Sequence, residues 1–170
     1  MRYRTIALWF LLVALPCYAL DQWTKRLVSS RMDIGDGFTV IPGFFDIIHT
    51  RNTGAAFGIL QGLPEQYRIW LFGSMTIVAC VLLVLVFTRT GDSSWTMSAV
   101  LSLVIAGALG NLTDRLLHGE VVDFLSLHVG RFRWPTFNMA DTWITLGMAG
   151  LLARTFLFRP GAGPPPTPRA

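Results

Sequence analysis

Two uninterrupted apolar runs limit what this chain can fold into. Residues 69–88 and 93–113 contain no charged side chain over about 20 positions each, and about 20 apolar residues in a helix cross a hydrocarbon core of about 30 Å. Only 14% of all residues are charged, whereas soluble domains usually carry about 25%. We therefore predict a membrane protein. No basic stripe with interleaved aromatic residues is present, so nucleic acid is not expected as a partner.

Two more apolar segments complete a prediction of four transmembrane helices. The expected spans are residues 5–26, 69–88, 93–115 and 137–158, in a single all-α membrane domain that covers residues 1–158. Residues 159–170 are rich in Pro and Gly, which predicts a disordered tail.

The first segment could also be a removable signal peptide, because residues 13–17 resemble a lipoprotein cleavage box before Cys17. Pro16, however, stands where a small residue is wanted, and the chain does not become polar afterwards. We favour a retained helix, which Pro16 would kink unless neighbouring helices satisfy the freed carbonyl. A secreted lipoprotein is the alternative, and a mature N-terminus at Met1 or Arg2 would exclude it. Cys17 and Cys80 are expected to be buried, inert thiols.

The longest polar segment covers residues 28–65. Around Pro42 and Gly43, β-branched and aromatic residues predict two short strands joined by a turn, and thus a small antiparallel sheet outside the membrane. Asn52 follows as a candidate turn residue. Gly54 opens a stretch of small residues that would let the backbone pass close to another surface.

Charge counting does not orient this arrangement. Four spans place both termini on one side, with six cationic residues on that side and eight on the other, although the short basic N-terminus favours termini inside. Nine of the ten acidic residues lie on the eight-cation side. The polar chemistry must therefore take place there.

Several polar residues stand at the ends of the predicted spans. Asp21 and Lys25 are spaced i and i+4, which fits either a local ion pair or a contact at the site. Asn111 shares a helical face with Asp114 and Arg115, while the last two are adjacent and point apart. Asn138 is a candidate N-cap for the helix that begins near Asp141. Each residue also has a purely structural explanation.

Asp123 and Asp141 are the candidate catalytic pair. Carboxylates near hydrocarbon are costly and point to function, and a short re-entrant connection over residues 125–136 could place the two face to face. In a low dielectric one carboxyl would keep a proton while the other acts as a base that activates water. The histidines are not at zinc-ligand spacing, and no GxSxG sequence is present, so we expect no metal and no serine nucleophile. A catalytically idle scaffold or transporter subunit remains the alternative, and Asp123→Asn separates the two.

Five stretches together resemble the lipoprotein signal peptidase family of bacteria, also called signal peptidase II. They are Asp21-Gln-x-x-Lys25, Asn52-Thr-Gly-Ala-Ala-Phe57, Gly107-x-x-Gly110-Asn111-x-x-Asp114-Arg115, Val122-Asp123-Phe124 and Phe137-Asn138-x-Ala140-Asp141. The family's usual Gly-Gly-Ala before the third motif is Ala106-Gly107-Ala108 here, and the Pro-rich tail lies outside the family pattern.

The resemblance implies a peptidase that cleaves prolipoproteins before a diacylglyceryl-modified cysteine, without a cofactor. It implies Asp123 and Asp141 as the catalytic dyad, a small sheet and a lid on the outer face of the bacterial cytoplasmic membrane, and both termini in the cytoplasm. Globomycin-type cyclic peptides are the expected inhibitors, and we expect a monomer. We expect Asn52 and Arg115 to hydrogen-bond the backbone of substrate or inhibitor. The residues expected to line or support the site are Asp21, Lys25, Asn52, Gly54, Asn111, Asp114, Arg115 and Asn138.

Overall fold

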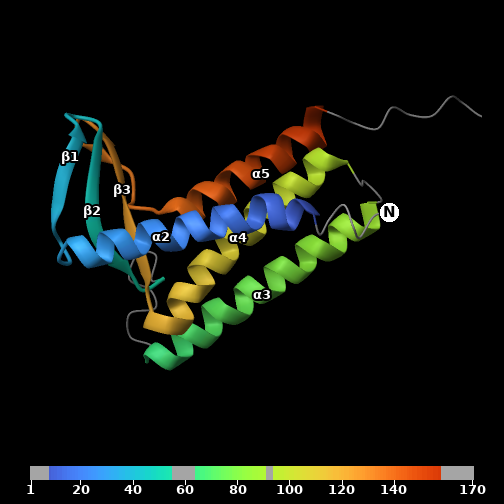
Figure 1. Cartoon of the computed structure of the whole chain (residues 1–170), viewed down its shortest axis with the longest axis horizontal. Helices are drawn as coiled ribbons and strands as arrows, with labels where there is room; N and C mark the ends of the chain where they lie inside the picture. Colours follow the sequence, from blue (N-terminus) through green and yellow to red (C-terminus); the bar gives the residue numbers. More distant parts are fainter. Residues whose placement is uncertain (1–7, 55–63, 91–93, 158–170) are drawn as a thin grey trace, which may run out of the picture.

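The computed structural model describes residues 8–54, 64–90 and 94–157. A short π-helix, η1 (Phe10–Ala14), leads into α2 (Leu15–Arg31), and the other helices are α3 (Glu65–Thr90), α4 (Trp95–His118) and α5 (Met139–Leu157). Figure 1 shows the helices side by side, with the sheet at one end of the bundle. The start of η1 and the end of α5 both lie at the opposite end, as an even number of crossings requires.

All four predicted helices are present, but their bounds differ from the prediction. Helix α2 continues to Arg31, so residues 28–31 are helical and the prediction that they belong to the outer loop is wrong. The reason is local: no Gly or Pro interrupts the chain until Gly35, and the helix ends where Met32 turns to extended backbone. The Pro-rich tail and residues 55–63 lie outside the described residues.

Pro16 does not break the first helix. It falls at the start of α2, directly after the five-residue π-helix Phe10–Ala14. Proline has no N–H and its ring crowds the carbonyl four residues earlier, and a wider π turn accommodates both effects. The expected disturbance is thus present as one wide turn in a continuous helix.

The sheet is larger than predicted. Its order is β1-β2-β3-β4, and every neighbouring pair is antiparallel. The two predicted strands are β1 (Gly37–Ile41) and β2 (Phe45–Asn52). Strands β3 (Val121–Val129) and β4 (Phe132–Arg133) form a hairpin across residues 125–136. The short connection expected there is thus a β-hairpin, and it returns the chain to β3, where Phe137 pairs with Leu125.

The hairpin was missed although residues 125–129 alternate between apolar and polar side chains, because its second strand has only two residues and gives no pattern of its own. Residues 121–124 of β3 are buried, and the strand contacts α2 and α4 in addition to its neighbour β2. Gly130 has a φ of 58° and turns the chain back at the end of β3, a conformation that glycine adopts without strain. Strand β3 carries Asp123 opposite Thr50 of β2.

Small residues let α4 approach both α2 and α5. A Cβ at Gly107 would collide with the Ala140 carbonyl oxygen and come within 2.7 Å of the Ile144 side chain. A Cβ at Gly110 would collide with the Asp21 carboxylate. Close backbone approach of this kind is typical of helix contacts in membranes. Here it draws the ends of three helices together beside β3.

Two of the helices, within the described part of the chain, are long and apolar enough to cross a bilayer. They cover Gln66–Leu85 and Trp95–His118, with mean hydropathies of 2.1 and 1.6. Helix α3 also turns large apolar side chains outward, among them Trp70, Met75, Val78 and Val81. An exposed apolar surface of this extent requires a non-aqueous neighbour, which supports the prediction of a membrane protein.

Candidate active site

Asp123 and Asp141 come from different elements, and the Asn138 side chain joins them. Asn138 Nδ2 donates to Asp123 Oδ1 at 2.7 Å, while Asn138 Oδ1 accepts the backbone N–H of Asp141 at 3.0 Å. Asn138 is fully buried. The hairpin over residues 125–136 returns the chain to β3, and the predicted proximity of the two aspartates to a common site agrees with this geometry.

The position of Asp141 follows from how α5 begins. Asn138 precedes the helix, and its backbone N–H donates to Asp141 Oδ2 at 3.3 Å while its side chain accepts from the Asp141 N–H. This reciprocal pair has the pattern of a capping box, with Asp in place of the usual Glu. Asp141 therefore stands in the first turn, where the helix dipole favours an anion.

Asn111 of α4 contacts the same carboxylate. Its Nδ2 donates to Asp141 Oδ1 at 2.7 Å. Its Oδ1 accepts from Asn138 Nδ2 at 3.1 Å and from Lys25 Nζ at 2.9 Å. One carboxamide thus connects a cation on α2 with an aspartate on α5.

Asp123 is almost completely buried, with 1% of its surface exposed. Burial raises the pKa of this carboxyl to about 6, against the hydrogen bond from Asn52 and with the charge of Asp141 adding to the rise. Asn52 Nδ2 donates to Asp123 Oδ2 at 2.9 Å. The Thr50 hydroxyl donates to the Asp123 backbone carbonyl at 3.0 Å and fixes the strand. Asp123 therefore holds a proton up to a higher pH than an ordinary aspartate does.

Gly54 holds Asn52 in place. The Gly54 N–H donates to Asn52 Oδ1 at 2.8 Å, so the other end of the carboxamide faces Asp123. Gly54 has a φ of +80°, and a Cβ there would lie 2.5 Å from the ring of Phe72. Both the backbone conformation and the space require glycine.

Lys25 lies in a buried ionic cluster behind the two aspartates. Its Nζ is 2.9 Å from Asp21 Oδ2 and 3.1 Å from Asp114 Oδ2. The predicted i,i+4 ion pair is present, and Lys25 also reaches the site through Asn111. Asp21 Oδ1 accepts the Ala140 N–H at 2.8 Å, and Asp114 Oδ2 accepts the Val122 N–H at 3.2 Å. The cluster therefore links α2 and α4 to the residues that directly precede the two aspartates, Ala140 before Asp141 and Val122 before Asp123.

Arg115 lies at the edge of the site. Its Nη1 donates to the Asn111 carbonyl at 3.2 Å, and its guanidinium stands 5.2 Å from the centre of the Phe72 ring. It also interacts electrostatically with Asp141, Asp123 and Asp114. The buried Nε has no hydrogen-bond partner among the described residues. Donors are thus left for a bound ligand.

All ten predicted site residues lie in this one region, and two contributors were missed. Gln22 Nε2 donates to Asp114 Oδ1 at 3.0 Å and to the Gly110 carbonyl at 3.2 Å. Its position three residues before Lys25 on an apolar helix was the signal that could have found it. Phe72, which contacts Arg115 and Gly54, has no such signal in the sequence.

His49 and His128 bond to partners away from the two aspartates, while His118 lines a small cavity together with Lys25 and Asp114. His49 Nδ1 bonds the Met32 carbonyl at 2.9 Å, and His128 Nε2 is 3.1 Å from Asp46 Oδ2. No cluster of three His, Cys, Asp or Glu side chains suited to a metal occurs among residues 8–54, 64–90 and 94–157. The absence of a metal stays a prediction for the enzyme.

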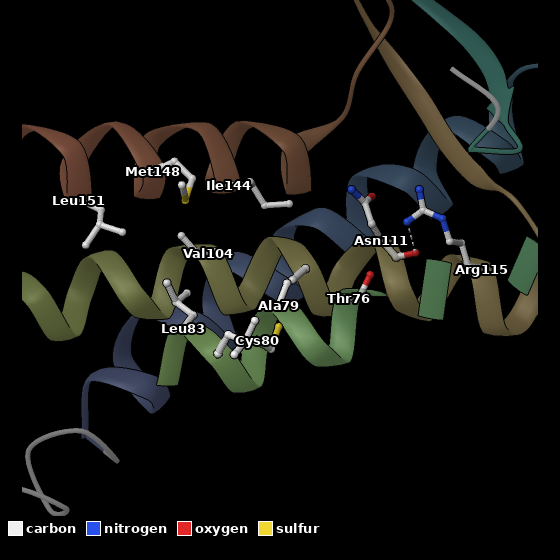
Figure 2. A pocket seen from close by; sticks show the side chains of 12 residues that line it. Thr76, Ala79, Cys80, Leu83, Val104, Asn111, Arg115, Ile144, Met148 and Leu151 are labelled. Atoms are coloured by element: carbon white, nitrogen blue, oxygen red, sulfur yellow. Dashed lines mark hydrogen bonds between the residues drawn. The ribbon is translucent and has the colours of Figure 1, made fainter. Parts of the chain in front are cut away.

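An apolar cavity of about 810 Å³ opens between α3, α4 and α5, beside the site. Figure 2 shows Leu151, Met148 and Ile144 of α5 lying along it, with Asn111 and Arg115 at the end nearest the sheet. A second cavity of about 450 Å³ borders Asp141 and includes Thr142, Thr145 and Leu146 of α5. Apolar cavities on two sides of α5 therefore extend to polar site residues, one to Asn111 and Arg115 and the other to Asp141.

Two solved structures with a similar fold are described as bacterial membrane enzymes. One, described as a bacterial membrane enzyme determined by the in meso method at 1.9 Å resolution, superposes with a TM-score of 0.78 at 37% identity, covering 88% of this chain and 94% of that one. Another, described in the same way at 2.3 Å, gives a TM-score of 0.75 at 38% identity, covering 90% and 93%. Fold and sequence similarity together thus define the class as a membrane enzyme.

Relatives of known type narrow that class. The lipoprotein signal peptidase of Syntrophus aciditrophicus (strain SB) is 44% identical over 143 residues, which cover 84% of this chain and 89% of the relative. That of Staphylococcus aureus (strain JH9) is 41% identical over 138 residues, covering 81% and 82%. The family model for signal peptidase (SPase) II matches residues 13–157. The chain belongs to the signal peptidase II family of peptidases.

Proposed function

We propose that this protein is an aspartic endopeptidase that removes the signal peptide of diacylglyceryl-modified prolipoproteins, cutting before the lipidated cysteine. One observation supports the chemistry above the others. Two aspartates from a strand and a helix are held by the same buried carboxamide of Asn138, at 2.7 Å from Asp123 and 3.0 Å from the Asp141 N–H. A structural role alone gives no reason to concentrate this much buried charge where apolar cavities end.

The proposed chemistry needs one proton shared by the pair. The ionised aspartate takes a proton from the attacking water, and the protonated one donates to the scissile carbonyl oxygen. The raised pKa of Asp123, about 6, fits it to the role of proton donor. Asp141, at a helix N-terminus and bonded by Asn111, fits the role of base. Water is then added across the peptide bond, and the aspartates exchange roles as the amine leaves.

The surroundings suit a substrate with long apolar parts. The cavity of about 810 Å³ is lined almost wholly by apolar side chains and ends at Asn111 and Arg115. The second cavity reaches Asp141 from the other side of α5. A substrate whose signal helix and acyl chains both lie in lipid can fill such cavities while its scissile bond remains at the dyad. Arg115 and Asn52 would then hydrogen-bond the substrate backbone, or that of a globomycin-type inhibitor.

The proposed arrangement in the bilayer follows from the ends of the helices. Tyr67 and Trp70 of α3 are exposed near the sheet end, and Trp9 stacks on Trp95 at 5.9 Å at the other end. Tryptophan and tyrosine gather at the two membrane interfaces, and α4 between them spans about 36 Å at 1.5 Å per residue. We propose four spans in the bacterial cytoplasmic membrane, formed by the four long helices, with the sheet and a lid on the outer face, cytoplasmic termini and a monomeric enzyme.

Cleavage of a defined substrate tests this proposal. Purified protein in lipid or detergent is incubated with a prolipoprotein peptide that carries a diacylglyceryl cysteine, beside the same peptide with an unmodified cysteine. Mass spectrometry should find a product that begins with the lipidated cysteine, and the unmodified peptide should remain intact. Cleavage at another bond, or equal cleavage of both peptides, would contradict the proposed specificity. No cleavage of either peptide would favour the scaffold alternative.

A further inference from the structure

The orientation of the Asn111 carboxamide is fixed by its two neighbours. Lys25 Nζ lies 2.9 Å and Asn138 Nδ2 3.1 Å from the same Asn111 atom. An ammonium group and an amide NH₂ can only donate, so that atom must be the oxygen. The amide nitrogen of Asn111 therefore faces Asp141 Oδ1, at 2.7 Å. With neither neighbour able to accept a hydrogen bond, the flipped amide would lose all three contacts.

Lys25 also strengthens the donor that Asp141 receives. A hydrogen bond from a charged ammonium polarises the amide it reaches, and bonds in such a chain reinforce one another at low dielectric. Lys25 is 2% exposed and Asn111 7% exposed, so solvent does not weaken this chain much. The cation therefore acts on Asp141 through one intervening side chain.

The other charges around Asp141 do not replace this contact. Asp123 faces it as a like charge, while Arg115 is the nearby cation on α4 and interacts with Asp123 and Asp114 as well. Lys25 itself faces Asp21 and Asp114. Among these charged side chains of the described residues, only Lys25 donates to the side-chain amide of Asn111. That amide in turn donates to Asp141 Oδ1.

We infer that Lys25 is a positioning residue: it orients and polarises Asn111 so that Asp141 stays a carboxylate while the proton of the pair resides on Asp123. The inference rests on the proposed peptidase function and on the roles proposed there for the two aspartates, and it adds what keeps Asp141 ionised. Lys25 does not touch the reacting atoms. Its effect reaches the chemistry through the protonation state of Asp141.

The test is the pH profile of kcat/KM for cleavage of the lipidated peptide. Lys25→Met removes the donor to Asn111 but leaves two buried carboxylates without their cation. The variant Lys25→Met/Asp114→Asn removes one positive and one negative charge, so the net charge of the cluster is unchanged. Asp114→Asn alone keeps the bond from Lys25 to Asn111. Arg26→Met removes an exposed cation from the next position of the same helix.

In both variants that lack Lys25, the acidic limb of the profile should move to higher pH by about one unit. The reason is that the Asp141 carboxylate then receives a weaker hydrogen bond and lies farther from a cation, so it takes up a proton more readily. Asp114→Asn and Arg26→Met should not move it upward. A lower rate with an unmoved acidic limb in the folded double variant would overturn the inference and leave Lys25 a purely structural role. Failure of the wild-type protein to cleave at any pH would overturn the proposed function, and this inference with it.

Discussion

Asn138 Nδ2 lies 2.7 Å from Asp123 Oδ1, so the residue that caps helix α5 also holds the aspartate of strand β3. The cap fixes Asp141 in the first turn of the same helix. The start of α5 and the geometry of the proposed dyad are therefore one structural feature. A change at this position should affect stability and catalysis together.

Asn138→Ala should reduce kcat by at least about 100-fold, because Asp123 loses a donor and Asp141 loses the cap that positions it. It should also lower the free energy of unfolding by about 2 kcal/mol, the combined order of a lost N-cap and an unsatisfied buried group. Steady-state cleavage and thermal unfolding in detergent measure the two effects.

Ser94→Ala provides a matched control, because Ser94 caps α4 by accepting the Met97 N–H at the end of the bundle away from the sheet. It should cost about 1 kcal/mol of stability and leave kcat unchanged. Equal losses of activity in the two cap variants would contradict a specific role for Asn138.

The pH dependence of the free enzyme should report Asp123. Its pKa of about 6 means that the carboxyl is protonated below that pH and loses the proton above it. If Asp123 donates this proton, kcat/KM should fall on the alkaline side, by about tenfold per pH unit well beyond the transition. A profile that stays flat from pH 6 to 9 would exclude Asp123 as the donor. The substrate must carry no titrating group in this range.

The free energy of unfolding should also depend on pH through Asp123, and the direction of the change is defined. A carboxyl whose pKa is raised on folding favours the folded state below its unfolded value near 4, and this contribution is lost as pH rises through about 6. Asp123→Asn cannot titrate, so its stability relative to wild type should increase between pH 4 and pH 7, by on the order of 2 kcal/mol. Unfolding of both proteins across this range measures it. A constant difference would mean that Asp123 titrates normally.

Gly107→Ala should lower activity and stability together. A Cβ there meets the Ala140 carbonyl and the Ile144 side chain, and would push α5, which carries Asp141, away from α4. Overpacking of this kind costs about 1–3 kcal/mol. Gly73→Ala, in another membrane helix, places its Cβ at an ordinary 3.6 Å from Leu112 and should be tolerated. Similar behaviour of the two variants in unfolding and cleavage assays would refute the close-packing argument.

Arg115→Ala should weaken binding of substrate and of a globomycin-type inhibitor by about tenfold or more, the scale of a hydrogen bond from a charged group. Arg115→Lys should restore little, since an ammonium lacks the planar fork and stacks less well on Phe72. Arg131→Ala, exposed in the β3–β4 turn, should bind normally. Inhibitor titration measures each affinity. Unchanged affinity in Arg115→Ala would remove this residue from the binding site.

The sequence was informative where side-chain chemistry repeats along one element. Uncharged runs predicted the helices, and Pro42 and Gly43 predicted the first hairpin. The β3–β4 hairpin was missed because β4 has only two residues, too few to give a strand pattern, although residues 125–129 of β3 do alternate. Contacts between distant segments, such as Asn138 with Asp123, depend on three-dimensional packing that no local pattern encodes. The motifs selected the site residues, but only the fold assigns their partners.

The proposed mechanism depends on Asp123 and Asp141, and three proteins assayed side by side test that dependence. Wild type, Asp123→Asn and Asp141→Asn are purified in parallel, shown to be folded by circular dichroism and thermal unfolding, and assayed on the diacylglyceryl-modified peptide. We expect wild type to cut before the lipidated cysteine and each variant to lose at least about a thousandfold in kcat. Near-wild-type cleavage by either folded variant would contradict the dyad and with it the proposed mechanism.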